Sequence, residues 1–219
     1  MIIFQSLKPS IEKFDLSKIP HNSAEYIQLL TEIERRAFAD RSDLMGDPDF
    51  MNLPVYEFMD EEYIEDRMKS FSWEEATPSS EIKPGEVIFN ESDETTHFSI
   101  IDKNGNAVSV TTTLNNSFGS KVYVENSGFF LNNEMDDFSS KPGFPNFFGV
   151  LGSEANSIQP GKRMLSAMTP TIVLKNNKPK LILGSPGGPS IITSVFQTIL
   201  NVIEYEMDVN EAVSAPRDR

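Results

Sequence analysis

The feature that most constrains the fold of this chain is a change of periodicity at Thr95. Apolar residues recur at helical spacing upstream, at Ile27, Leu30, Ile33 and Ala37. Downstream, residues 97–102 and 107–113 alternate or are β-branched, and between them lies Asn104-Gly105, the strongest short signal for a hairpin turn. The sequence therefore predicts a helical first part followed by antiparallel strands.

The helical part is predicted to cover most of residues 1–50. Asn22 and Glu25 form a plausible capping pair at its start, and Gly46-Asp47-Pro48 is a turn signal at its end. A second, short and acidic helix is expected from about Asp60 to Met68. Four charged residues are expected on the faces of the first helix away from its apolar stripe, namely Glu32, Glu34, Arg35 and Arg36.

The Asn104-Gly105 hairpin brings two threonines together. If these two residues form the turn, residue 103 pairs with 106 and the register continues until residue 96 pairs with Thr113. Thr113 then lies beside the Thr95-Thr96 end of the first strand. A cross-strand threonine pair with a purely structural role is the alternative.

A second hairpin is predicted from residue 171 to residue 183, with its turn at Asn176-Asn177. The segment Gly184-Ser185-Pro186-Gly187-Gly188 follows, and then a helix. The apolar positions of that helix predict its buried face, which consists of Ile191, Ile192, Val195, Phe196, Ile199 and Leu200.

Composition excludes several classes of function. The 219 residues contain 38% hydrophobic and 24% charged residues, as in soluble globular proteins, and carry a net charge of −14, which disfavours nucleic acid as a partner. No stretch approaches the roughly 20 apolar residues that span a bilayer. With no cysteine and two histidines, a cysteine nucleophile is impossible and a serine triad must use His21 or His97.

Thr95 offers a nucleophile that needs no histidine. If the peptide bond between Glu94 and Thr95 is cut, the α-amino group of Thr95 becomes its general base. That amine titrates near ~7.7–8.0, close to working pH. The preceding stretch, residues 70–95, is rich in Pro, Gly, Ser and charge, which is typical of an interdomain linker or of an exposed loop where a cut is tolerated.

Three other segments carry chemistry. Gly187-Gly188, between a strand and a helix start, suits an oxyanion hole, a phosphate site (although the Walker spacing is absent) or a structural turn. The acidic and amide-rich residues 132–138 suit a substrate ammonium, a weakly supported cation site or a solvated turn. Residues 162–166, Lys-Arg-Met-Leu-Ser, suit a substrate carboxylate or ion pairs with the surplus acidic groups.

Taken in order, these segments resemble the γ-glutamyltransferase (γ-glutamyltranspeptidase, glutathione hydrolase) family. The resemblance covers nearly the whole chain. It rests on Glu91-Ser-x-x-Thr95-Thr96-His97-Phe98-Ser99, Thr111-x-Thr113-Leu114-Asn115, residues 131–139, Lys162-Arg163-x-Leu165-Ser166, Gly184-Ser185-Pro186-Gly187-Gly188, and the earlier Ala39-Asp40-Arg41-Ser42 and Gly46-Asp47-Pro48.

The resemblance implies an α+β fold of the N-terminal-nucleophile hydrolase type, an αββα sandwich that is partial here. Residues 1–94 would be the end of a large subunit and residues 95–219 most of a small one. The precursor would cut itself between Glu94 and Thr95 into a heterodimer. Neither cofactor nor metal is expected, and the family implies a periplasmic or extracellular location.

The resemblance also assigns roles to individual residues. Thr95 would be the nucleophile and Thr113 would position it, while Gly187 and Gly188 would form the oxyanion hole. The α-amino group of a γ-glutamyl substrate such as glutathione would be bound by Asn115, Glu134 and Asp137. Ser166 would hold its α-carboxylate. Water, an amino acid or a peptide would accept the acyl group.

Two departures leave alternatives open. The family usually has a second serine after Ser166, where this chain has Ala167. The family also has a part of the large subunit upstream of the position of Met1, which supplies an arginine to the substrate carboxylate, and final strands beyond the position of Arg219. A related acylase, such as a cephalosporin acylase or poly-γ-glutamate depolymerase, and a truncated non-catalytic remnant are therefore the rival interpretations. The chain resembles the middle of a longer enzyme, and we expect it to be nearly inactive alone. The sequence does not distinguish hydrolysis from transpeptidation.

Overall fold

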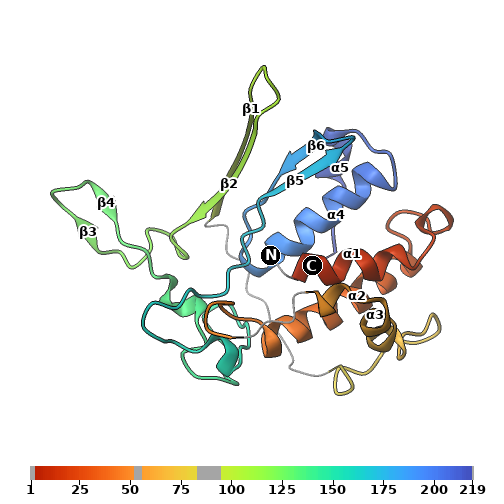
Figure 1. Ribbon diagram of the computed structural model, residues 1–219, viewed down its shortest axis with the longest axis horizontal. Coiled ribbons are helices and arrows are strands. Elements are labelled where there is room, and N and C mark those ends of the chain that lie inside the picture. Colours follow the sequence, from red (N-terminus) through yellow and green to blue (C-terminus); the bar gives the residue numbers. More distant parts are fainter. Residues whose placement is uncertain (1–2, 52–55, 83–94, 219) are drawn as a thin grey trace.

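The computed structural model describes residues 3–51, 56–82 and 95–218, which form helices and three antiparallel hairpins (Figure 1). The helices are α1 Ile3–Glu12, α2 Ala24–Leu44, α3 Glu61–Met68, α4 Ile191–Ile203 and α5 Val209–Ser214. The strands are β1 Thr95–Ile101, β2 Ala107–Thr113, β3 Tyr123–Val124, β4 Phe129–Phe130, β5 Thr171–Lys175 and β6 Lys178–Leu183. None of the described helices is long and apolar enough to cross a membrane.

Helix α2 confirms the predicted long helix, but the expected cap was wrong. The N-cap is Ser23, whose side chain accepts a hydrogen bond from the Tyr26 amide, while Asn22 has a positive φ of 54° just before it. The short helix α3 begins after Asp60, whose carboxylate accepts hydrogen bonds from the amides of Glu62 and Tyr63. The predicted boundaries of α3 are confirmed.

The sequence predicted that the charged residues of α2 lie on faces away from its apolar stripe, but most of them are buried. Glu32, Glu34 and Arg36 are buried, whereas Ile27, expected in the apolar stripe, is 41% exposed. The Glu32 carboxylate pairs with Arg36 and accepts a hydrogen bond from the Thr77 amide. These contacts fasten the segment after α3 onto α2, which explains why charges lie inside.

The β1–β2 hairpin brings Thr95 directly opposite Thr113, one residue away from the predicted register. Ile101 pairs with Ala107, so the loop covers residues 102–106 and is longer than a two-residue turn. The Asp102 carboxylate holds this loop by accepting hydrogen bonds from the amides of Asn104 and Asn106. The longer loop accounts for the shift, and the predicted proximity of Thr113 to Thr95 is confirmed.

The second predicted hairpin is β5–β6. Asn176 and Asn177 both have positive φ, 52° and 59°, as a tight hairpin turn requires. Helix α4 follows, and its apolar face packs into one core with α1 and α2, through Ile192, Phe196 and Leu200 on one side and Leu7, Leu30 and Ile33 on the other. The segments before and after Thr95 therefore share a hydrophobic core, while their assignment to two subunits stays a prediction.

Candidate active site

A cavity of about 170 Å³ lies where the ends of β1 and β2 meet the loops that follow β4 and β6. Six of the predicted site residues line it, namely Thr95, Thr113, Asn115, Asp137, Ser166 and Gly188. Two others, Glu134 and Gly187, are not among its lining residues. Glu94, on the other side of the expected cleavage point, lies outside the described residues.

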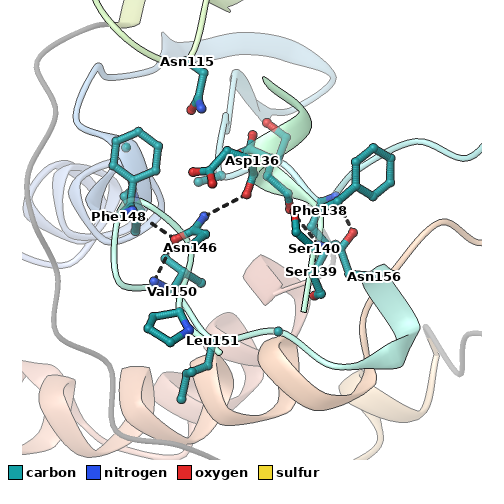
Figure 2. Close-up of a pocket in the computed structure, with 18 of the residues that line it drawn as sticks. Asn115, Asp136, Phe138, Ser139, Ser140, Asn146, Phe148, Val150, Leu151 and Asn156 are labelled. Carbon is teal, nitrogen blue, oxygen red and sulfur yellow. Dashed lines mark hydrogen bonds between the residues drawn. The ribbon is translucent and has the colours of Figure 1, made fainter. Parts of the chain in front are cut away.

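The hairpin ends place two hydroxyls and an amide at the cavity. The Thr113 hydroxyl oxygen accepts a hydrogen bond from the Asn115 amide at 3.0 Å. Asn115 itself is buried, has a positive φ of 75°, and donates from its side chain to the Asn133 carbonyl at 3.2 Å. Thr113 therefore stabilises the unusual backbone turn that aims Asn115 at the cavity (Figure 2).

The acidic segment, residues 132–138, contains a short 3-10 helix, Glu134–Asp137, whose residues Asp136 and Asp137 line the cavity. Burial, with smaller contributions from the nearby Glu134 and Asp136 carboxylates, raises the pKa of Asp137 to about 7, and Arg41 opposes the shift. Burial also raises the pKa of Glu134. A carboxylate whose charged form is destabilised by burial gains most from a cationic ligand.

Arg41 was missed as a site residue, although its Ala-Asp-Arg-Ser segment was noted in the sequence. It lines the cavity from α2 and is only 8% exposed. Burial lowers its pKa and the charge of Asp137 raises it. Its neighbours Asp40 and Ser42 are polar, and an arginine in such a stretch of helix is usually a surface residue.

The loop after Phe138 forms one wall of the cavity and was not predicted as part of the site. Asn146 organises it, because its side-chain oxygen accepts from the amides of Phe148 and Val150 and its side-chain nitrogen donates to the Asp136 carbonyl (Figure 2). Asn156 donates to the Asp137 carbonyl at 2.7 Å and fixes that residue from behind. These uncharged side-chain amides thus hold the acidic segment in place through hydrogen bonds to its backbone.

The basic segment, residues 162–166, contributes Leu165 and Ser166 to the cavity lining, and Ala167 follows them there. Its Arg163 does not reach the cavity lining; the guanidinium pairs with Asp47 and Asp49, which follow α2. The hydrogen bonds from Arg163 hold the pKa of Asp47 well below its usual range. Of the two sequence-based alternatives for the arginine, the ion pair is therefore the one that the structure supports.

The glycine turn, residues 184–188, contributes Gly188 to the cavity lining. Gly187 and Gly188 have positive φ values of 128° and 53°, the first of which is a conformation that side-chain-bearing residues rarely adopt. A short 3-10 helix, Gly188–Ser190, leads directly into α4. Among the described residues, no group of three or more His, Asp or Glu side chains is arranged to hold a metal ion.

Comparison with known proteins places this geometry in context. The family model for gamma-glutamyltranspeptidase matches residues 1–218. A glutathione hydrolase proenzyme from Escherichia coli (strain K12) is 48% identical over 207 residues, which are 94% of this chain and 36% of that protein. The chain thus spans little more than a third of the length of this curated relative.

Two solved structures are similar to the chain. A Helicobacter pylori gamma-glutamyltranspeptidase point mutant has 61% sequence identity and a TM-score of 0.55, and the match covers 56% of this chain and 66% of the other. A cephalosporin acylase from Bacillus halodurans has a TM-score of 0.75 over 99% of this chain and 36% of the other, at 21% identity, which speaks for the fold alone. The expected N-terminal-nucleophile hydrolase fold is confirmed, and the chain belongs to the gamma-glutamyltranspeptidase family.

Proposed function

We propose that the protein transfers γ-glutamyl groups, to water or to an amine, through Thr95. The Thr95 hydroxyl oxygen attacks the γ-glutamyl carbonyl carbon of a donor such as glutathione, and the free amine of Thr95 takes the hydroxyl proton. The amine then passes that proton to the leaving nitrogen, and the acyl group remains as an ester on Thr95. Water or an amino acid or peptide amine attacks the ester and releases the product.

The same hydroxyl prepares the site. In the precursor, Thr95 attacks the carbonyl carbon of Glu94, the bond to its own nitrogen breaks, and an ester replaces the peptide bond. Water hydrolyses this ester, which leaves a carboxylate on Glu94 and a free amine on Thr95. The products are a large and a small subunit that stay together as a heterodimer. The proenzyme name of the Escherichia coli relative is consistent with such processing.

The observation that carries the proposal is the convergence of chemically distinct groups on one cavity. Thr95 supplies the nucleophile, Asp137 and Asn115 supply oxygen acceptors for a substrate ammonium, and Ser166 supplies a donor for its carboxylate. The amides of Gly187 and Gly188 would stabilise the oxyanion. Arg41 adds a positive charge to the cavity lining. No cofactor or metal takes part in this scheme.

Self-cleavage is the first test. Intact-mass analysis of the purified chain should show two pieces, residues 1–94 and 95–219, and Thr95→Ala should remain a single chain. Thr96→Ala is the matched control, since it removes the neighbouring hydroxyl and should leave the cut in place. A cut that persists in Thr95→Ala would identify a contaminating protease and remove the support for this mechanism.

Turnover is tested in a chimera in which this chain replaces the matching segment of the Escherichia coli relative. The chimera should hydrolyse a γ-glutamyl anilide, and Thr95→Ala should abolish that activity. Chimera subunits that separate under native gel filtration after cleavage would contradict the heterodimer.

A related acylase is the second candidate, because Ala167 lines the cavity where the family usually has a serine. An apolar methyl there removes one donor to the substrate carboxylate, and a hydrogen bond to a charged group is worth about 1.5–3 kcal/mol. The chimera should therefore be assayed with glutaryl and γ-glutamyl anilides side by side. Faster turnover of the glutaryl compound, which lacks the α-amino group and keeps the carboxyl group, would favour the acylase.

A further inference from the structure

One face of the β1–β2 hairpin is built almost entirely of polar side chains. Alternate residues of a strand share a face, so Thr95, His97 and Ser99 lie on the same side of β1. Their partners across the hairpin are Thr113, Thr111 and Ser109 respectively. We call these six residues the polar face. Only its first pair, Thr95 and Thr113, has a role in the proposed chemistry.

The polar face is fastened to β6 by hydroxyls. The Ser99 hydroxyl donates to the Ile182 carbonyl at 3.0 Å, and the Ser109 hydroxyl donates to the Leu183 carbonyl at 3.0 Å. These two bonds join the hairpin that carries Thr95 to the strand that leads into the glycine turn. In Figure 1, the rest of the hairpin extends away from the body of the protein, so its position depends on few contacts.

His97 lies between the nucleophile and this attachment. Its Nδ1 is 2.8 Å from the Thr111 hydroxyl and its Nε2 is 3.0 Å from the Ser99 hydroxyl. Because Ser99 has one hydroxyl proton and gives it to Ile182, it must accept from His97. The ring is therefore protonated on Nε2, and Nδ1 accepts from Thr111.

The ring also rests against the start of the glycine turn. A Cβ atom at Gly184 would be 2.2 Å from Nδ1 and 2.4 Å from Cε1 of His97, far closer than atoms can approach. Gly184 is therefore required by close packing. The imidazole is thus hydrogen-bonded to Thr111 on β2 and to Ser99 on β1, and the Ser99 hydroxyl is in turn bonded to β6. The ring also contacts Gly184, from which the chain continues to Gly187 and Gly188.

We propose that His97 is a positioning residue, whose neutral ring fixes the Thr95 end of the hairpin against the glycine turn by bridging Thr111 and Ser99. It acts through these neighbours and transfers no proton itself. The distance between the Thr95 hydroxyl and the turn is the quantity it controls. This inference rests on the proposed function of Thr95, but the hydrogen bonds that it predicts exist whether or not the chain is active.

The hydrogen-bonding state of His97 is measured first, in the whole chain. The ring nitrogens are labelled with ¹⁵N, and because there are only two histidines the His21→Gln variant assigns the spectrum. We expect the Nε2-protonated tautomer for His97 at pH 8, with loss of that preference in Ser99→Ala. An Nδ1-protonated ring, or an even mixture of tautomers, would overturn the proposal.

Two amide substitutions then distinguish the two hydrogen bonds of the His97 ring. The side-chain amide of Gln reaches the position of Nε2 and can still donate to Ser99, whereas that of Asn reaches only the position of Nδ1. His97→Gln should keep the self-cleavage rate within about threefold, and His97→Asn should lower it about 10- to 100-fold, as small displacements of reacting groups do. Their thermal unfolding temperatures should agree with one another.

Threonine methyl NMR provides the readout that does not need cleavage. The Thr95 methyl signal should move in His97→Asn and in Ser99→Ala, and it should stay in place in His97→Gln. Equal rates and an unmoved Thr95 signal in His97→Asn would show that the ring only fills space. If the unmodified chain fails to cleave itself, the proposed function has failed, and the tautomer and methyl signals alone decide the positioning role.

Discussion

Arg41 and Asp137 interact through their charges inside the cavity without forming a direct ion pair in the part of the chain that the structure describes. Burial disfavours the charged form of each side chain, since it lowers the pKa of Arg41 and raises that of Asp137. Their separation leaves both able to receive a ligand. A zwitterion with an ammonium and a carboxylate has the complementary charges.

The coupling between these two residues should depend on pH. Because the pKa of Asp137 is raised to about 7 in the folded chain, its ionisation lowers stability as pH rises from about 4 through 7, and Arg41 offsets this loss. A double-mutant cycle of Arg41→Met and Asp137→Asn, measured by urea unfolding, should give little coupling at pH 5 and about 1–3 kcal/mol at pH 8. The same coupling at both pH values would contradict the interaction.

Asp137 should be needed for substrate but not for self-cleavage. In the chimera with the Escherichia coli relative, Asp137→Asn should lower the kcat/KM for a γ-glutamyl anilide by about 100-fold or more, since a buried charged contact worth about 3 kcal/mol is lost. Self-cleavage, which has no free substrate, should proceed as before. Asp136→Asn, which alters the neighbouring carboxylate, is the matched control. Normal turnover by Asp137→Asn would contradict a role in substrate binding and favour the interpretation of the acidic segment as a solvated turn.

Thr113 should act through its hydroxyl oxygen rather than through its shape. Thr113→Val keeps the volume and removes the acceptor for the Asn115 amide, so it should lower stability by about 1 kcal/mol and disturb the positive-φ turn at Asn115. Thr113→Ser retains the oxygen and should stay close to the unmodified chain. Urea unfolding and the Asn115 amide signal in NMR measure the two effects. If both variants behave alike, the hydrogen bond has no such role.

Local sequence patterns predicted the elements that local physics decides. Periodicity and turn residues predicted helices α2 and α3, both long hairpins and the buried face of α4. Ile199 is the exception on that face, because it is only half-buried. The candidate site also emerged largely from sequence, since the motif order gave Thr95, Asn115 and Asp137, which share one cavity. The roles assigned to them stay predictions.

Side-chain contacts, both within loops and between distant segments, decided what the sequence patterns did not predict. The hairpin register shifted because the Asp102 side chain stabilises a longer loop than Asn104-Gly105 alone would form. The charges of α2 lie inside because distant segments supply their partners, as Thr77 does for Glu32. Arg41 lines the cavity for the same reason, and no pattern within a helix indicates that a charge faces a loop about a hundred residues away.

Glu34 provides a test of buried charge far from the cavity. It lies on α2, is 7% exposed, and has Gln197 as a side-chain hydrogen-bond donor at 3.4 Å. Burial, with a smaller contribution from Asp218, raises its pKa to about 8. An unfolded chain ionises this residue near its ordinary value of 4.5, so between these two values the folded chain holds more protons. The contribution of Glu34 to stability therefore falls as pH rises from about 4.5 to 8.

Glu34→Gln should remove that pH dependence, because the amide stays neutral and can still accept from Gln197. The variant should match the unmodified chain at pH 4 and exceed it at pH 8, by no more than about 5 kcal/mol, since each unit of pKa shift corresponds to about 1.36 kcal/mol. Urea unfolding at both pH values measures the difference. Glu62→Gln, on the exposed side of α3, is the control and should shift stability little at either pH. A Glu34→Gln chain that is equally or less stable than the unmodified one at pH 8 would show that Glu34 is ionised and compensated by partners at that pH.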